Sequence, residues 1–215
     1  MSTLRVPPGR AGRLRLRRRL EVAARGADLL DRKLRALLVV QRALRQAAEA
    51  SDRAWRESAA AATTWLGRAL AAGGRDALRQ ALPAAPALVA VHDAVSMGVR
   101  YPASAECELP DRDSAIVDPG NAALICARDA YQDAARKGVQ AAVDCAAART
   151  VDAAVATTRQ QLRALRRHWI PRLEEAVAHL ELVLEQADFE DGVRRRRAAG
   201  SERLSRYGEG RGRAP

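Results

Sequence analysis

Small and apolar residues recur at alternating steps of four and three along the first part of the chain, and residues 10–78 contain no proline. A 3.5-residue repeat sustained over many heptads is typical of a helix that supercoils around a partner helix. Gln41 is the one member of this repeat that is both large and polar. The members are Leu16, Leu20, Ala23, Ala27, Leu30, Leu34, Leu37, Gln41, Leu44, Ala48, Ser51, Trp55, Ser58, Ala62, Trp65 and Ala69.

A second, looser repeat runs to about Asp191. Three charged residues interrupt it, Asp152, Arg159 and Arg166, and two interpretations stay open. They mark either a hydrated stretch of the seam or a local register shift that brings Leu165 inward. The repeat comprises Leu124, Ala127, Tyr131, Ala134, Gly138, Ala141, Cys145, Ala148, Asp152, Val155, Arg159, Leu162, Arg166, Trp169, Leu173, Ala176, Leu180, Val183 and Ala187.

The two repeats predict an all-α fold, a long antiparallel two-helix coiled coil with a small irregular or β-hairpin head between the helices. Each run of about 70 residues makes a rod on the order of 100 Å. Pairing within one chain is favoured by effective concentration over a parallel dimer of long hairpins. We expect a helix over 1–79, a proline-rich head over 80–120, a helix over 121–191 that follows a Pro119-Gly120-Asn121 turn, and a basic disordered tail over 192–215.

Composition and charge fit this prediction. Hydrophobic residues make up 48% of the chain but aromatic residues only 3%, which argues against a sheet-rich globule. The net charge is +11, and it belongs to the ends, because residues 1–25 carry eight arginines and residues 192–215 carry another eight. Antiparallel pairing would bring these two basic ends together. The three scattered cysteines and the lack of a long apolar run predict a cytoplasmic chain without membrane insertion.

Candidate chemistry is sparse. The histidines, His92, His168 and His179, lie far from the cysteines and from one another, so we expect no metal site. No phosphate-binding glycine motif is present, and we expect no catalytic residue and no cofactor. Asp111 and Asp113 fit a charged loop better than an acid pair. The three tryptophans, Trp55, Trp65 and Trp169, all fall on the predicted seams, where core packing is favoured over a nucleic-acid stacking platform.

Three stretches resemble the D subunit, the central rotor shaft of the V-type and A-type rotary ATPases. The first is the opening "PPGRAGRLRLRRRLEVAARGADLLDRKLRALL", with its basic start, spaced leucines and Leu-Leu-x-x-Lys run. The second is "MGVRYP" at residues 97–102. The third is "TRQQLRALRRHWIPRLEEAVAHLELVLEQADFED", in which Ile-Pro-Arg-Leu lies inside a long helical pattern and is followed by acidic residues.

The resemblance implies a non-catalytic rotor element. Its coiled coil would lie inside a ring of catalytic and non-catalytic nucleotide-binding subunits (A and B). Its head would contact the small F subunit of the stalk, and its lower end would couple to the membrane ring through the socket-like C (or d) subunit. The chain would thus be peripherally membrane-associated, without direct insertion, and nucleic-acid binding is not expected. Interface candidates are Arg13, Arg17, Arg18, Pro171, Arg172, Met97, Gly98 and Val99.

Two mechanical hypotheses accompany this interpretation. Small seam residues would let the helices approach closely and form a thin shaft. Pro171 would bend its helix at a fixed place, so that rotation becomes an off-centre push on the ring; the alternative is a bend that merely follows the partner helix. Two other functional classes stay open, a basic coiled coil that binds nucleic acid or an anionic membrane, and a cytosolic chaperone or tether. The direction of ATP turnover and the identity of the transported ion are properties of other chains.

Overall fold

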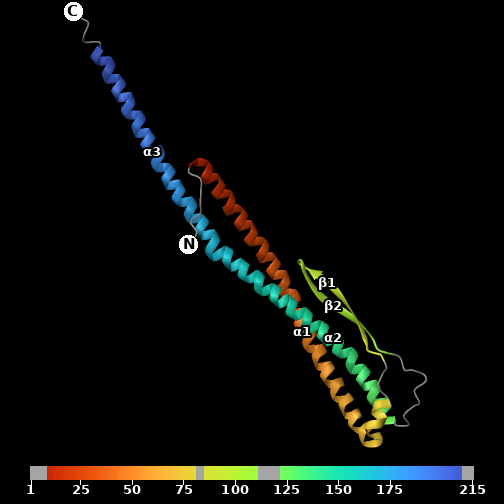
Figure 1. Cartoon of the computed structure of the whole chain (residues 1–215). Helices are drawn as coiled ribbons and strands as arrows, with labels where there is room; N and C mark the ends of the chain where they lie inside the picture. Colours follow the sequence, from red (N-terminus) through yellow and green to blue (C-terminus); the bar gives the residue numbers. More distant parts are fainter. Residues whose placement is uncertain (1–8, 81–84, 111–121, 210–215) are drawn as a thin grey trace, which may run out of the picture. The chain divides into compact units, whose positions relative to one another are not determined.

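The computed structural model describes residues 9–80, 85–110 and 122–209. The elements are helix α1 (Arg10–Gln80), strands β1 (Leu88–Ser96) and β2 (Val99–Glu108), helix α2 (Ala122–Ala164), a π-helical turn η1 (Leu165–Trp169) and helix α3 (Ile170–Glu209) (Figure 1). The predicted fold class is confirmed, because long antiparallel helices pack together and a β-hairpin lies between them in sequence. The chain divides into two units, Met1–Asp31 with Gln160–Pro215 (unit 1) and Arg32–Arg159 (unit 2).

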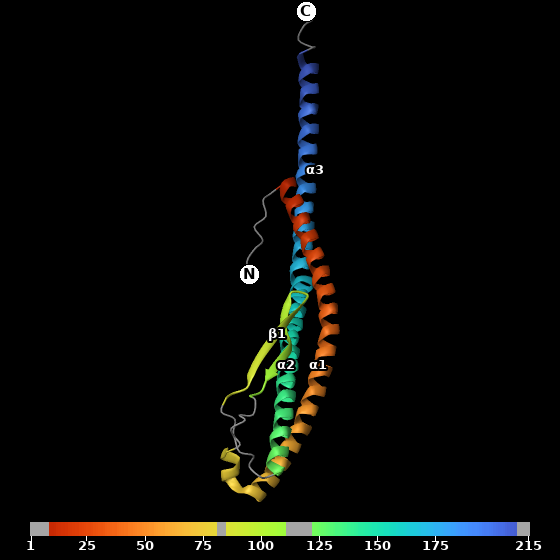
Figure 2. The same ribbon diagram turned by 90° about the vertical axis from the view of Figure 1, so that its right-hand side faces the viewer.

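In unit 2, α1 and α2 run beside each other in both views (Figures 1 and 2). One core cluster centres on Leu37, which is 0% exposed, with Val151 and Val155. A second cluster contains Ala69, Leu124 and Ala127. Low numbers on α1 therefore pair with high numbers on α2, as an antiparallel arrangement requires.

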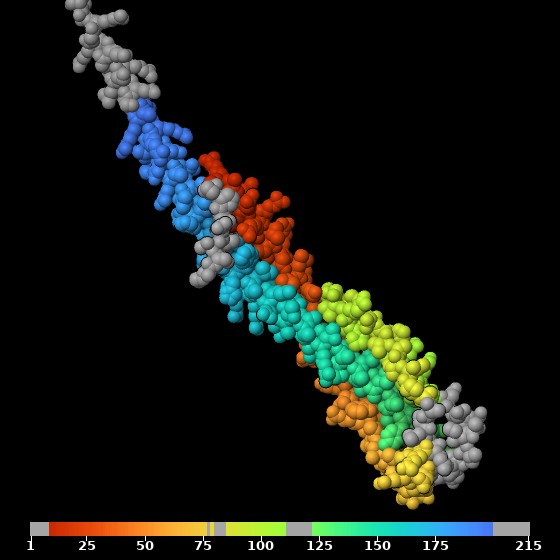
Figure 3. Space-filling view, viewed as in Figure 1, coloured from red at the N-terminus to blue at the C-terminus, as the bar shows by residue number. Residues whose placement is uncertain are grey.

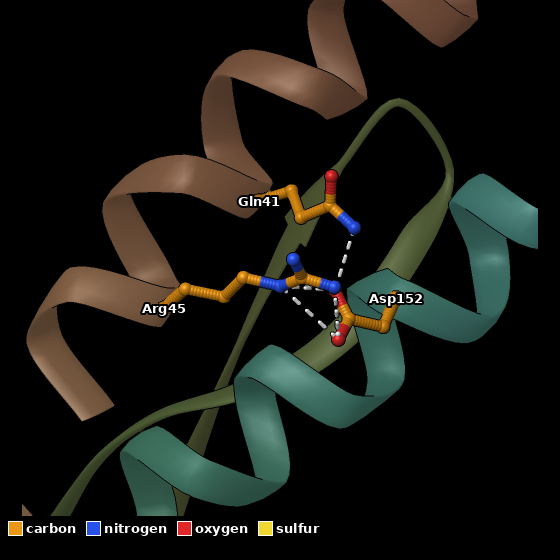
Figure 4. Close-up of polar contacts among 3 residues, drawn as sticks. All are labelled: Gln41, Arg45 and Asp152. Carbon is orange, nitrogen blue, oxygen red and sulfur yellow. Dashed lines mark hydrogen bonds and ion pairs between the residues drawn. The ribbon is translucent and has the colours of Figure 1, made fainter. Parts of the chain in front are cut away.

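Between these clusters the seam contains a polar group, the side chains of Gln41, Arg45 and Asp152 (Figure 4). Gln41 donates from Nε2 to Asp152 Oδ1 at 2.6 Å, and Arg45 donates from Nε at 3.0 Å and Nη2 at 2.9 Å to the two carboxylate oxygens. The hydrogen bond from Arg45 holds the pKa of Asp152 below its ordinary value, assisted by Gln41. Gln41 and Asp152, two polar residues at predicted seam positions, are thus hydrogen-bonded to each other across the seam.

Farther along the same seam, Trp55 of α1 lies over Gly138 of α2. A Cβ placed on Gly138 would come 3.0 Å from Trp55 Nε1 and 3.2 Å from its Cδ1. The indole occupies the space that a side chain at residue 138 would need, and Trp55 is still 41% exposed. The prediction that this tryptophan packs in the core is therefore wrong, because the ring covers the edge of the seam instead of entering it.

β1 and β2 form an antiparallel hairpin with a two-residue turn at Met97 and Gly98. Both turn residues have positive φ, 50° for Met97 and 75° for Gly98, as a type I′ turn requires. Val99 and Tyr101 of β2 pack against the Leu37 cluster, which fixes the hairpin to the two helices of unit 2. Figure 3 shows the hairpin lying along α2 with one face open.

The last turns of α1 are interrupted at Gly74, whose backbone has φ 69° and ψ −172°. Only glycine adopts this conformation readily, because a Cβ would clash with the neighbouring backbone. The interruption is thus a kink at one residue, in the second glycine of a Gly73-Gly74 pair. The predicted turn at Pro119-Gly120-Asn121 and the acidic pair Asp111 and Asp113 lie outside the described residues.

In unit 1, the start of α1 packs against α3 through a core of Leu16, Ala23 and Leu173. Two ion pairs join the same helices, Arg10 with Asp188 at 3.3 Å and Arg17 with Glu181. Residues 173–193 of α3 carry seven acidic side chains and no lysine or arginine. The N-terminal arginines therefore lie alongside this acidic run, where the sequence predicted that they would lie beside the basic C-terminal segment.

The π-helical turn η1 directly precedes Pro171. Ile170, the residue before the proline, donates its backbone N–H to the carbonyl of Leu165, five residues back. Pro171 has no N–H and its ring crowds the carbonyl four residues earlier, so a wider turn at this place relieves the conflict. Leu162 and Leu173, both members of the predicted repeat, are buried on either side of this turn.

The burial of neighbouring residues bears on the two interpretations of the charged seam residues. Val151 and Thr158 are buried and Leu165 is half-buried, whereas Arg159 and Arg166 are exposed. At these alternate positions the inward residue falls one before the predicted one, and Leu165 lies farther inward than Arg166, whereas Ala148, Val155 and Leu162 keep the predicted phase.

Beyond Asp191, α3 continues as a helix to Glu209. This differs from the predicted disordered tail over 192–215, of which residues 210–215 lie outside the described part. Local contacts explain the helix: Arg194 pairs with Glu190 at 3.1 Å, and Arg196 donates to the carbonyl of Gly192. Alanine and arginine also have high helix propensity.

Candidate interaction groove of unit 1

A groove of about 590 Å³ opens in unit 1 where α1 passes η1. Helix α1 contributes three arginines and three small or apolar residues, and η1 contributes one aliphatic and one aromatic side chain. The lining residues are Arg15, Arg18, Arg19, Val22, Ala23, Gly26, Leu165 and Trp169. The groove thus combines guanidinium groups with an apolar floor.

Two features of the local sequence produce this groove. Gly26 has no side chain, and a Cβ at this position would meet nothing within 4 Å, so space is left between the helices. The π turn rotates Trp169 partly off the seam, and its side chain is 37% exposed. The predicted core role of Trp169 is therefore wrong, and the tryptophan forms part of an open surface instead.

The charges around the groove are held in defined positions. The guanidinium carbon of Arg19 lies 6.0 Å from the centroid of the Trp169 ring, at the outer limit of a cation–π interaction. Arg166 of η1 pairs with Asp31 of α1 at 3.6 Å and fixes the turn to the helix. Among the described residues, no acidic side chain forms an ion pair with Arg15, Arg18 or Arg19.

The predicted interface residues divide into three groups. Arg18 lines the groove, while Arg17 is engaged with Glu181 and Arg13 is half-buried. Pro171 is half-buried after the π turn and Arg172 is exposed beside it.

The remaining candidates belong to unit 2. Met97 and Gly98 form the exposed tip of the hairpin, and Val99 packs into the Leu37 cluster. Met97 is the one described non-glycine residue with positive φ, a conformation that side chains other than Gly, Asn and Asp rarely adopt. This strained and exposed tip is a candidate contact, whereas Val99 has a structural role in the core.

The groove is suited to binding and not to catalysis. Three guanidinium groups favour carboxylates, which they can bind in bidentate geometry, and the exposed ring of Trp169 favours an apolar side chain. No group of three histidine, cysteine or acidic residues in the described part of the chain is placed to hold a metal ion. Nor does any described helix combine the length and apolarity needed to cross a membrane.

The comparison with protein families is decisive for the identity of this molecule. The model of the family described as the ATP synthase D subunit matches residues 13–200. The chain belongs to this family. Its members are non-catalytic central stalk subunits of V/A-type rotary ATPases, as the resemblance of the three sequence stretches predicted.

The match includes both units of this member of the D-subunit family. It spans the groove, the hairpin and the π turn with Pro171, and it ends within α3. No curated protein matches the chain closely enough to be identified as a relative.

Proposed function

We propose that the chain couples nucleotide turnover in a ring of catalytic and non-catalytic subunits (A and B) to ion movement through a membrane ring. The family match over residues 13–200 carries this proposal. The paired helices of each unit support it, because deformation of an interdigitated seam is resisted more strongly than bending of one helix. A cytoplasmic location, with attachment to the membrane through the complex alone, belongs to the same proposal.

Partner contacts follow from the two exposed features described above. The groove with Arg15, Arg18 and Arg19 would receive side chains from the surrounding A and B subunits. Differential contact with these subunits at each rotor angle would favour different conformations of the ring, which is a population shift. The hairpin tip at Met97 and Gly98 would contact the small F subunit, and the other end of the stalk would couple to the socket-like C (or d) subunit.

Pro171 has a mechanical role in this proposal. It fixes the π turn beside the groove, and a defined local bend would turn rotation into an off-centre push on the ring. In the variant Pro171→Ala, residue 171 regains a backbone N–H, and η1 can return to α-helical hydrogen bonding. We expect reduced torque in single-molecule rotation and looser coupling. Full torque and full coupling in this variant would contradict the role of the proline.

The central experiment is co-purification of the tagged full chain with A and B subunits, followed by measurement of their ATP turnover. We expect capture of both subunits and stimulated turnover. The variant Arg15→Glu/Arg18→Glu/Arg19→Glu should lower the stimulation, with Arg53→Glu as control for charge reversal at an exposed arginine of α1. A chain that captures neither of them, but binds DNA with a steep salt dependence, would instead support the nucleic-acid class.

A further inference from the structure

The seam of unit 2 is rich in alanine, and such a seam defines its own alignment poorly. Between the Leu37 cluster and the Ala69 cluster, many seam positions are small. A shift of one helix by seven residues would place alanine against alanine again, with little change in packing. The small residues are Ala48, Ser51, Ser58 and Ala62 on α1, and Ala134, Ala141 and Ala148 on α2.

Two contacts in this seam differ from the rest because their partners are not interchangeable. Asp152 receives hydrogen bonds from Gln41 and Arg45 across the seam. Trp55 covers Gly138, where even a Cβ would lie 3.0 Å from the indole, so a larger residue would displace the ring. Trp55 lies fourteen residues after Gln41, and Gly138 lies fourteen residues before Asp152, so both contacts specify one alignment.

We propose that these five residues, Gln41, Arg45, Trp55, Gly138 and Asp152, form a register lock that fixes the axial alignment of α1 against α2. The register lock concerns packing between two helices of the same chain and requires no partner subunit. Its test is therefore separate from the test of the rotor function.

A slip by one heptad in one direction is opposed by charge. It would move Asp152 from Gln41 and Arg45 to the next heptad of α1, where Asp52 stands. Arg159 would take the place of Asp152 and face Arg45. Both new contacts would bring like charges together across the two helices, which is unfavourable.

A slip in the opposite direction is opposed by desolvation and by volume. It would place the Asp152 carboxylate against Leu34 and Leu38, which offer it no hydrogen bond. It would also bring Tyr131 opposite Trp55, where Gly138 now leaves space. The same few residues thus disfavour both neighbouring alignments, as the polar positions of coiled coils do when they specify register.

The alignment is measurable in the full chain by pulsed electron paramagnetic resonance. Spin labels are attached at Ala60 of α1 and Ala146 of α2, both exposed, with the three native cysteines replaced by serine. These positions are offset along the axis, so a slip of one heptad changes their separation by about 10 Å. The parent protein is expected to give a single distance.

The variant Asp152→Leu/Trp55→Ala removes both contacts and makes residue 152 compatible with Leu34 and Leu38. We expect a second population whose labels are about 10 Å farther apart, with helical content preserved in circular dichroism. The control is Asp144→Leu/Trp65→Ala, which makes the same changes on the same helices. Among the described contacts Asp144 bonds Gln140 of its own helix, and Trp65 packs against the Ala69 cluster. The control therefore removes apolar burial without removing a polar contact between the helices, and it should keep one distance.

A second variant preserves the lock with reversed charges, Gln41→Glu/Arg45→Glu/Asp152→Arg. It should keep the parent distance, because the charge pairing across the seam is restored. A single unshifted distance in the double variant would overturn the proposal, and so would a second population of equal size in the control. A slipped distance in the charge-reversed variant would also contradict it.

Discussion

Leu173 tests whether a narrow two-helix core stabilises unit 1 as strongly as its burial implies. This side chain is 0% exposed and packs with Leu16 and Ala23, flanked by Ile170 and Leu180. Leu173→Ala removes three buried carbon atoms and leaves a cavity that the opposing helix fills only in part. Buried Leu→Ala changes cost about 3 to 5 kcal/mol, and the half-exposed flanks of a two-helix seam favour the lower end, about 3 kcal/mol.

Leu182→Ala is the matched control for this substitution, because Leu182 lies on the same helix but is 60% exposed. Its loss should cost no more than about 0.5 kcal/mol. Urea unfolding followed by circular dichroism measures both free energies of unfolding. Native-state hydrogen exchange then locates the effect, and faster exchange is expected in the unit 1 segments of α1 and α3. Equal free energies for the two variants would refute the assignment of Leu173 to the core.

Three further predictions follow from contacts in the two units. Gly74→Ala should destabilise the end of α1 by about 1 to 3 kcal/mol, because alanine disfavours the positive φ at this residue. The control is Gly67→Ala, which lies in regular helix with open space around it and should stabilise the protein by up to about 1 kcal/mol. Thermal unfolding measures both effects. Arg45 lowers the pKa of Asp152, so the ionised carboxylate stabilises the fold fully above its unfolded pKa of about 4, and this stabilisation is lost as pH falls through the lower folded pKa. The difference in the free energy of unfolding between the parent and Asp152→Asn should therefore shrink below about pH 4. A difference that stays constant with pH would contradict the pairing. Arg17→Glu should destabilise slightly, and adding Glu181→Arg should restore stability, with a coupling of about 0.5 kcal/mol in a double-mutant cycle.

Periodicity was sufficient to predict the fold and most of the α1 seam. Every member of the α1 repeat is buried or half-buried except Trp55, because a long heptad pattern leaves one face for the partner helix. The α2 seam was predicted less well. Val151 and Thr158 are buried where the heptad phase has Asp152 and Arg159, so the buried face departs from that phase at alternate positions, whereas Val155 and Leu162 keep it.

The groove was beyond what the sequence could predict. The cluster of N-terminal arginines was visible in the sequence. Which of them form ion pairs and which line the groove depends on how α1 and α3 are aligned along their axes. Arg17 meets Glu181 while Arg15, Arg18 and Arg19 line the groove. A proline preceded by an apolar and aromatic run, as at 165–171, is the one local signal that could have indicated an irregular turn here.

The π turn has a mechanical consequence. Ile170 bonds a carbonyl five residues back instead of four, and Pro171 donates no backbone hydrogen bond at all. The regular hydrogen-bond ladder of the helix is therefore interrupted at this place. Torsional stiffness should consequently vary along the molecule, and an applied twist would be stored first in the segment that contains the π turn.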